Sequence, residues 1–314
     1  MKKWMMLCGL IFTVLLWGDT KDPSFWRMVR NGVDGEIVLT VVDDQSRPVP
    51  DANVHVEFSE VRGLNVVDSR TDSDGKCVLR QRTSGNKITI LLSKDGYYDS
   101  RMDFSLIKIG NVHEIRNGRW QPWPIEKKIE LRKKRSPVRL QIQSKILYCA
   151  KTNHWIGVDL EIGDLVAPYG SGGYSDFELL IQWDGLDFLR SKVCFADIRF
   201  TQPFSGGYFT PRVQESMFPH AYGADKNQIG VQKFRVQNRK GDFQSTHKPF
   251  PLDVNFITRT RCEVDNDGRL KNANYGSIRQ LDVSPGDVGS NSVVVYIHTV
   301  FNSTPNDTNL EPKK

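Results

Sequence analysis

The sequence has few of the residue patterns that mark an enzyme. It contains only 6 histidines in 314 residues, and no two of them are spaced as HxH or HExxH, the spacings by which a zinc hydrolase holds its metal. The nucleophile elbow GxSxG and the phosphate-binding P-loop are also missing. These absences exclude the enzyme classes that such motifs define, and we assign a catalytic role to no residue.

Long hydrophobic runs are also scarce. The longest, Trp4 to Trp17, follows Lys2 and Lys3 and has the charged start and short apolar core of an export signal. A spanning helix needs about 20 apolar residues. We therefore expect residues 1–18 to be a signal peptide cleaved after Gly18, with an uncleaved anchor as the alternative. We expect no other integral membrane span and an exported protein, whether periplasmic, cell-surface or secreted.

Cysteine is sparse, and no CxxC pair occurs. Four cysteines remain after export: Cys77, Cys149, Cys194 and Cys262. An exported protein can form disulfides, and the sequence leaves their state open. For Cys77, which follows strand periodicity, a buried thiol acting as a small hydrophobic side chain is favoured.

The net charge of +6 is mild for this length and does not indicate a nucleic-acid partner. Basic residues gather between Arg116 and Arg139, where an alternative is contact with anionic surface polymers. The favoured interpretation is a solvated last strand, with Ile125, Ile129 and Leu131 inward, followed by a linker.

Strand patterns are what the sequence has in abundance, and they are clearest between Glu36 and Tyr98. Ile37 to Val42 is a β-branched and leucine run, as expected for a buried strand. In the next strand Val54, Val56 and Phe58 alternate with polar residues. The sequence Asp72-Ser73-Asp74-Gly75 then predicts a tight turn. This part of the chain predicts a small antiparallel sandwich.

The order of these strands and turns resembles the carboxypeptidase regulatory-like domain, a transthyretin-like and Ig-like β-sandwich. The residues that carry the resemblance are Pro48-Val49, Asp51-Ala52, Val54, Thr71-Asp72, Asp74-Gly75, Lys94, Gly96 and Tyr97. The resemblance implies a fold and an extracytoplasmic location, and no catalytic residue comes with it.

The remainder of the chain is again rich in strands, and helical periodicity is scarce. Alternation recurs at Val158 to Ile162, at Phe177 to Trp183 and at Val293 to Ile297. The predicted fold class is all-β, with two β-sandwich domains, the second of jelly-roll type. The expected domains are the signal 1–18, an N-terminal arm 19–35 anchored by Trp26, the first sandwich 36–133, a linker 134–137, and the second sandwich 138–311.

Segments of the second sandwich resemble uncharacterised secreted proteins of bacteria. They are Gly157 to Gly173, Asn274 to Ile278, and Phe301 to Glu311. The resemblance implies export and carries no activity.

Two loops of the second sandwich share the sequence Ser-Gly-Gly-Tyr. Glycine beside an aromatic ring lets backbone and ring approach a flat ligand such as a sugar. The candidate ligand-binding residues are Tyr169, Tyr174, Tyr208 and Phe209. The competing interpretation, which we favour, is that the glycines make turns and the tyrosines cap the sandwich.

Oxygen-rich residues suggest two further alternatives. Asp265, Asn266 and Asp267 carry oxygens that suit calcium, although a plain Asx-type hairpin turn is favoured and no cofactor is expected. A hydrolase would need a carboxylate pair, for instance from Asp159, Asp164 and Asp176.

The sequence as a whole predicts a non-catalytic exported binding or structural protein of the bacterial envelope or cell surface, whose partner is a protein or a surface glycan. A carbohydrate-binding module using the Gly-Tyr loops is the first alternative. A glycan-active hydrolase is the second.

Overall fold

The structure is a computed structural model of the chain. It describes residues 23–60, 63–107, 115–150, 154–183, 193–213, 215–219, 221–239, 254–285 and 292–313. The chain divides into two compact units, Met1–Lys133 and Lys134–Lys314. The expected signal peptide lies outside the described residues, and no helix within the described ranges is long and apolar enough to cross a membrane.

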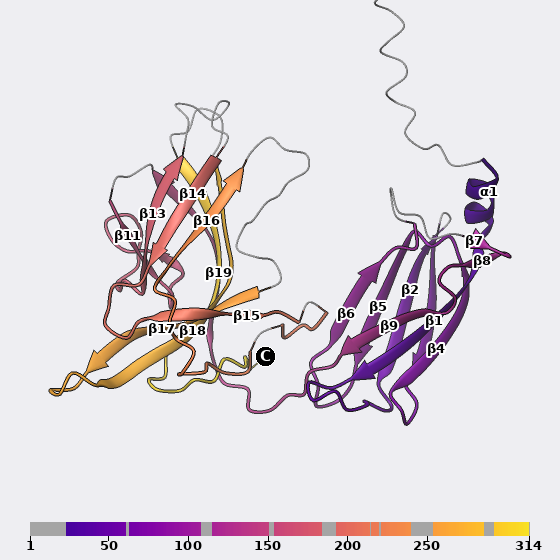
Figure 1. Ribbon diagram of the computed structural model, residues 1–314, viewed down its shortest axis with the longest axis horizontal. Helices are drawn as coiled ribbons and strands as arrows, with labels where there is room; N and C mark the ends of the chain where they lie inside the picture. The colour runs from indigo at the N-terminus through magenta and orange to yellow at the C-terminus, as the bar shows by residue number, and fades with distance from the viewer. Residues whose placement is uncertain are drawn as a thin grey trace, which may run out of the picture. The chain divides into compact units, whose positions relative to one another are not determined.

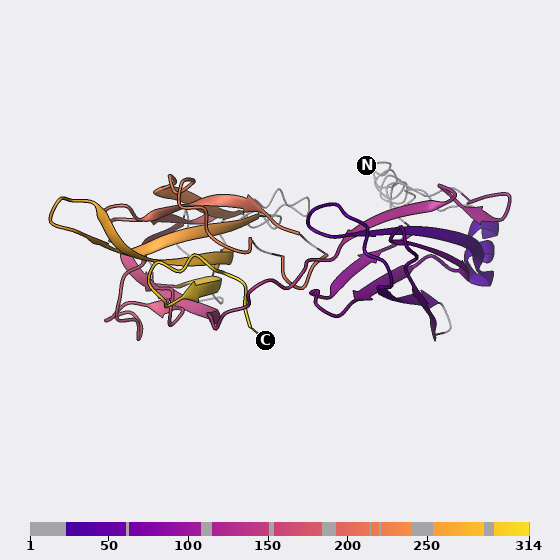
Figure 2. The same cartoon turned by 90° about the horizontal axis from the view of Figure 1, so that it is seen from below.

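The first unit is a two-layered β-sandwich (Figures 1 and 2). One sheet has the order β3-β2-β5-β6, from Gly63–Arg70, Asn53–Glu60, Lys87–Ser93 and Ser100–Phe104. The other pairs β1 (Val33–Val42) with β4 (Lys76–Thr83), with the short β8 (Arg119–Trp120) and with β9 (Ile125–Glu130), and β7 (Ile115–Arg116) pairs with β8. Strand β9 runs parallel to β1, whereas β4 runs antiparallel to it.

Alternating side chains from both sheets build the core of this unit. Val54, Val56 and Phe58 point inward from β2, and Cys77 and Leu79 point inward from β4. The expected inward positions of the last strand hold too, because Ile125, Ile129 and Leu131 are buried.

The structured part of this unit begins earlier than residue 36, the boundary expected from the sequence. Helix α1 (Pro23–Asn31) precedes β1, and Val29 and Val33 are both buried in the core. Gly32 ends the helix at φ 79°, and its amide donates to the Val29 carbonyl at 3.1 Å, as expected of a C-terminal glycine. Trp26, expected to anchor an arm, is 46% exposed.

The second unit is a sandwich of two antiparallel five-stranded sheets. One sheet, the long sheet, has the order β10-β19-β18-β17-β15, from Gln141–Ala150, Ser292–Asn302, Leu270–Pro285, Val254–Val264 and Gly206–Pro211. The other has the order β12-β11-β13-β14-β16, from Asp164–Leu165, Ile156–Asp159, Phe177–Trp183, Val193–Arg199 and Lys233–Arg239. The expected all-β fold with two sandwiches is confirmed.

The second unit buries side chains on both faces of its long sheet. The inner face packs on the other sheet through residues such as Leu179, Ile198 and Phe256. The outer face holds a smaller cluster of Ile257, Ala273, Tyr275 and Leu310. The chain segments near Tyr222 and Leu310 therefore cover part of that outer face, where the Leu310 amide donates to the Tyr222 carbonyl at 2.8 Å.

Two glycines test how tightly the first core is packed. Gly85 and Gly96 both have positive φ, at 69° and 80°. A methyl group on Gly85 would lie 2.8 Å from the Trp120 ring, whereas one on Gly96 would meet nothing within 4 Å. We expect Gly96→Ala to lower the free energy of unfolding by about 1 kcal/mol through backbone strain alone.

Gly85→Ala should lower the free energy of unfolding by about 1–3 kcal/mol more than Gly96→Ala does, because it also overpacks the core. Denaturant unfolding of both variants measures the difference. Equal losses would show that the core around Trp120 is loosely packed.

Candidate ligand-binding surface on the second sandwich

The glycine-rich loop between β12 and β13, residues 166–176, is folded closely on the sheet. The Gly172 amide donates to the Leu165 carbonyl at 2.9 Å, and the Ala167 amide donates to the Gly172 carbonyl at 3.2 Å. A methyl group on Gly172 would lie 2.8 Å from Cβ of Asp159 and 2.9 Å from the Leu165 oxygen. Glycine is therefore required here by close approach, and the loop has a defined course.

A partly buried arginine, 21% exposed, holds this loop to the opposite sheet. The Arg261 guanidinium donates to Asp159 Oδ1 at 3.0 Å and to both oxygens of Asp176 at 3.1 and 3.2 Å. Its third partner is Glu161 Oε2 at 2.5 Å. The Asp176 and Asp159 side chains are 0% and 4% exposed, whereas those of Arg261 and Glu161 are 21% and 37% exposed, so the network runs from the interior to the surface. We call Arg261, Asp159, Glu161 and Asp176 the arginine network.

Backbone amides complete the network. Asp159 Oδ2 accepts from the amides of Gly173 and Tyr174 at 3.0 and 3.1 Å, and Asp176 Oδ2 accepts from the Leu160 amide at 2.8 Å. One carboxylate thus fixes the second half of the loop directly. Carboxylates buried in this way are stable only when their oxygens are paired.

Burial and ion pairing shift the pKa values of the network in opposite directions. Burial raises the pKa of Asp176, and the hydrogen bonds and charge of Arg261 act against that rise. Burial alone would lower the pKa of Arg261, but the bonds to Asp176 and Glu161 and the charge of Asp159 outweigh it and raise that pKa. The guanidinium is therefore the fixed cation around which the acids are arranged.

Tyr174 and Tyr169 present their rings to solvent from this loop. They are 39% and 44% exposed. The Tyr174 ring lies 4.9 Å from the Arg261 guanidinium, and its hydroxyl accepts from Gln202 Nε2 at 2.7 Å. The Tyr169 hydroxyl pairs with His154 Nε2. Both rings are thus held in place while part of each side chain remains exposed.

The second Ser-Gly-Gly-Tyr loop reaches the first through Gln202. Gln202 bonds Tyr174, and its own carbonyl accepts from the Ser205 hydroxyl at 2.5 Å. Gly207 allows β15 to lie close to β17, since a methyl group there would be 2.1 Å from the Ile257 oxygen. The shared sequence therefore serves a different local structure in each loop.

Tyr208 and Phe209 are adjacent on β15, so their side chains point to opposite faces of the long sheet. The Tyr208 hydroxyl accepts from the Asp225 amide at 2.9 Å, and its ring packs on the outer cluster. The Phe209 ring contacts Phe234 and Phe256, with centroids 5.5 and 4.8 Å away. These two residues do not form one platform with each other.

The carboxylates considered for a hydrolase are engaged by protein donors. Asp159 and Asp176 share the Arg261 guanidinium. Asp164 lies on β12, just before the loop, and its Oδ2 accepts from the Ser171 hydroxyl and amide at 2.6 and 2.9 Å. Each of the three therefore holds the loop in its observed form.

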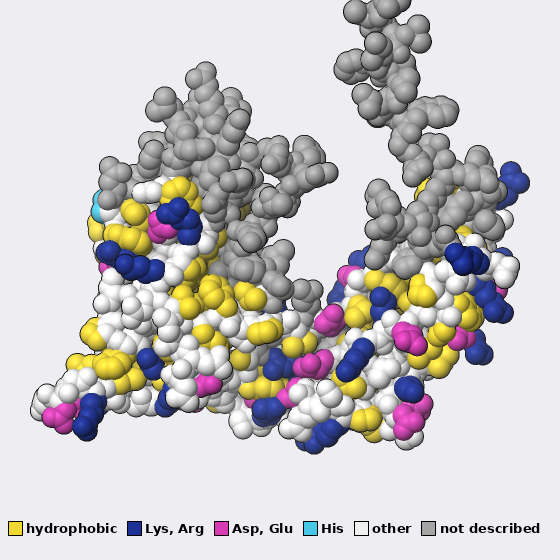
Figure 3. Space-filling view, viewed as in Figure 1, with side chains coloured by type: hydrophobic (Ala, Val, Ile, Leu, Met, Phe, Trp, Pro, Cys, Tyr) yellow, Lys and Arg dark blue, Asp and Glu magenta, His cyan; other side chains and the backbone are white. Residues whose placement is uncertain are grey.

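The two Asp-Gly turns have the same geometry. Asp265 Oδ1 accepts from the amides of Asp267 and Arg269, at 2.9 and 2.8 Å. Asp72 Oδ1 accepts from the amides of Asp74 and Lys76 at the same two distances. At the tip of the β17–β18 hairpin, acidic and basic side chains lie side by side (Figure 3). In the described ranges no group of three His, Cys, Asp or Glu residues is arranged to hold a metal.

Three of the cysteines are free thiols: Cys77, Cys149 and Cys262. Burial raises the pKa of Cys149 to about 12 and that of Cys262 to about 11. Thiols with raised pKa values are poor nucleophiles. The side chain of Cys194 lies outside the described part of the chain.

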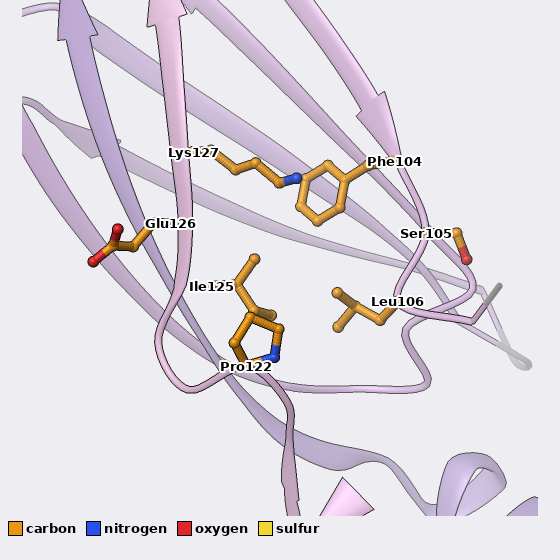
Figure 4. A pocket seen from close by; sticks show the side chains of 7 residues that line it. All are labelled: Phe104, Ser105, Leu106, Pro122, Ile125, Glu126 and Lys127. Carbon is orange, nitrogen blue, oxygen red and sulfur yellow. The ribbon is translucent and has the colours of Figure 1, made fainter. Parts of the chain in front are cut away.

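The first unit contains a cavity of about 310 Å³ (Figure 4). The Lys127 ammonium lies 4.5 Å from the centre of the Phe104 ring, beside the apolar side chains of Leu106, Pro122 and Ile125. Glu126 points away from these side chains in Figure 4. The cavity thus offers apolar surface and one cation that already contacts a ring, so it is a weaker candidate than the loop.

Comparisons with known proteins add little to this geometry. No protein-family model matches the sequence, and no curated protein matches it. Among solved structures, 3-chlorocatechol 1,2-dioxygenase from Rhodococcus opacus 1CP is 15% identical over 32% of this chain, with a TM-score of 0.27. The match covers 61% of the dioxygenase chain. A likeness of that extent carries no information on activity or ligand.

The sequence named Tyr169 and Tyr174 as candidates, and it gave no direct indication of Arg261 beneath them. One indirect signal was available in the sequence. Thr258 and Thr260 are polar residues at inward positions of a strand that also buries Phe256 in the core. Arg261 itself lies at a register shift in β17 with φ 50°, and no sequence pattern reports that conformation.

Arg261→Met should lower the free energy of unfolding of the second unit by about 3–5 kcal/mol, because it leaves buried carboxylates without their cation. Arg235→Met is the control: Arg235 pairs with Asp197 at 2.6 Å but is half exposed, and such pairs contribute about 0–1 kcal/mol. Denaturant unfolding at pH 7 compares them. Similar losses would contradict a structural role for the network.

The loss in Arg261→Met should shrink as the pH falls. Burial raises the pKa of Asp176 and Arg261 opposes the rise, so removing Arg261 leaves the raised pKa of the folded state. A folded-state pKa above the unfolded value favours folding at low pH, and the benefit is lost as pH rises through it. Unfolding at pH 5 and 7 should show a smaller difference from the wild type at pH 5. A constant difference would contradict this assignment.

Proposed function

We propose that this chain is a non-catalytic exported binding protein whose second sandwich recognises a saccharide surface through Tyr169 and Tyr174. The observation that carries the proposal is a pair of exposed tyrosine rings on a loop fixed by a buried ion network. An exposed aromatic ring leaves apolar surface in contact with water, and two such rings on one rigid loop favour a binding role.

The physical advantage of this arrangement is preorganisation. Ligand binding loses affinity when loops and side chains must be ordered on association. Here the loop amides of Gly173 and Tyr174 are bound to Asp159, and the Tyr174 hydroxyl is bound to Gln202. A flat apolar ligand face can then stack on a ring that is already in place.

A binding role also fits the hydrogen bonding of the three aspartates considered for a hydrolase. A hydrolase of the two-carboxylate type needs one protonated acid and one free base or nucleophile. Asp159, Asp164 and Asp176 each accept several hydrogen bonds from the protein. This supports a structural use of the three carboxylates.

The first unit supports an accessory role. Its order of strands and turns resembles the carboxypeptidase regulatory-like domain, which is appended to enzymes, transporters and surface proteins. Together with the export signal expected at residues 1–18, this favours a protein of the bacterial envelope or cell surface.

Tyr174→Ala should weaken retention on a bound polysaccharide by about tenfold or more, because a stacking contact is lost. Tyr169→Ala should act in the same direction. Affinity electrophoresis against a panel of polysaccharides measures both, and thermal unfolding checks that each variant is folded.

Tyr148→Ala is the matched control, since Tyr148 is 70% exposed on β10 rather than on the loop. It should leave retention unchanged. Retention that falls equally in Tyr148→Ala, or that survives in both loop variants, would contradict the proposed surface.

A further inference from the structure

A row of polar side chains crosses the outer face of the long sheet, away from the Gly-Tyr loop. Thr210 on β15 pairs with Asn255 on β17. Arg279 follows Ile278, whose partner is Phe256, so it lies beside Asn255. Next in the row is His298 on β19, which pairs with Gln280 on one side and Ser144 on the other.

A bulge in β18 turns Arg279 toward this face. The register shifts between Ile278 and Gln280, so two residues of β18 oppose the single His298 of β19. Ile278 and Leu281 both point into the inner core. The two residues between them, Arg279 and Gln280, are therefore left on the outer face.

The chain after β15, at residues 212–213 and 215–219, folds over this part of the sheet. The Val213 amide donates to the Pro219 carbonyl at 3.1 Å, and Asn255 Nδ2 donates to the same carbonyl at 3.5 Å. Asn255 and Phe218 are almost completely buried. The segment thus covers the Asn255 end of the row, and Arg212 at its start lies close enough to influence both Arg279 and His298.

Polar atoms in this enclosed region lack partners. Arg279 Nε, His298 Nε2 and Ser277 Oγ are buried and accept or donate no hydrogen bond. Within the described part of the chain, neither Arg212 nor Arg279 is paired with a carboxylate. Asp282, further along β18, accepts from the Gln280 side chain through Oδ2, and its Oδ1 is also buried without a partner.

The charges in the row repel one another. Burial, with a contribution from Arg212, lowers the pKa of Arg279 to about 9. Burial lowers the pKa of His298 as well, and both arginines add to that effect. Isolated buried cations of this kind are costly unless an anion accompanies them.

We propose that Arg212, Arg279 and His298 form a binding site for one oxyanion group, a carboxylate, sulfate or phosphate. Guanidinium groups match the geometry of such groups with two parallel hydrogen bonds. The site is independent of the tyrosine loop. Next to His298 on the same face, Tyr296 and Ile146 pair across β19 and β10 and are exposed, so a larger molecule carrying the oxyanion has apolar surface to rest on.

Thermal unfolding of the intact protein in sulfate, phosphate or glucuronate, each against chloride at equal ionic strength, tests the proposal. We expect at least one of the three to raise the Tm of the second unit by several degrees. In Arg279→Met the shift should disappear, and by calorimetry the affinity should fall about tenfold or more. The anion with the largest shift distinguishes an inorganic source from an acidic sugar.

Arg235→Met should keep the wild-type response, because Arg235 is paired with Asp197 on the other sheet. His298→Gln gives a second reading if Arg279→Met does not fold, and should also reduce the shift. Two results would overturn the proposal. One is a wild-type Tm that is no higher in any of the three anions than in chloride. The other is a Tm shift that Arg279→Met and His298→Gln both retain in full.

Discussion

The burial of one guanidinium, that of Arg261, is the interaction on which the second unit depends. It places a cation between two almost fully buried aspartates and an outer glutamate. Because charges in a protein interior are costly unless paired, the loop that ends in Asp176 and is held by Asp159 has one favourable position relative to β17. The exposed Tyr174 ring stacks on the same guanidinium, so the surface offered to a ligand is set by a contact beneath it.

The outer face of the same sheet shows the opposite electrostatic situation. Arg279 lies beside Arg212 and His298 with its Nε buried, and no carboxylate in the described ranges neutralises it. One cation of this sheet thus carries its anions within the fold, whereas the other needs an anion from outside. The contrast distinguishes the structural ion network around Arg261 from the proposed anion-binding site around Arg279.

Local pattern was enough to predict much of the fold. Alternation identified Val54, Val56 and Phe58 as inward, and the Asp-Gly turns formed as expected. The sequence did not predict β3, because it is an edge strand that is mostly exposed and has no buried residue. The sequence did not predict the arginine network, because Arg261 pairs with acids that lie 85 to 102 residues away along the chain. Such pairing depends on a bulge and on sheet packing, which periodicity does not encode.

Amide hydrogen exchange at Gly173 and Tyr174 tests the central claim, that the tyrosine loop is rigid before any ligand binds. Both amides lie in an exposed loop, yet both donate to the buried Asp159 carboxylate. The account predicts strong protection of these two amides in the free protein, close to that of the flanking strand β13. Exchange at the rate of an unstructured loop would contradict it, since the surface would then have to be ordered by its ligand.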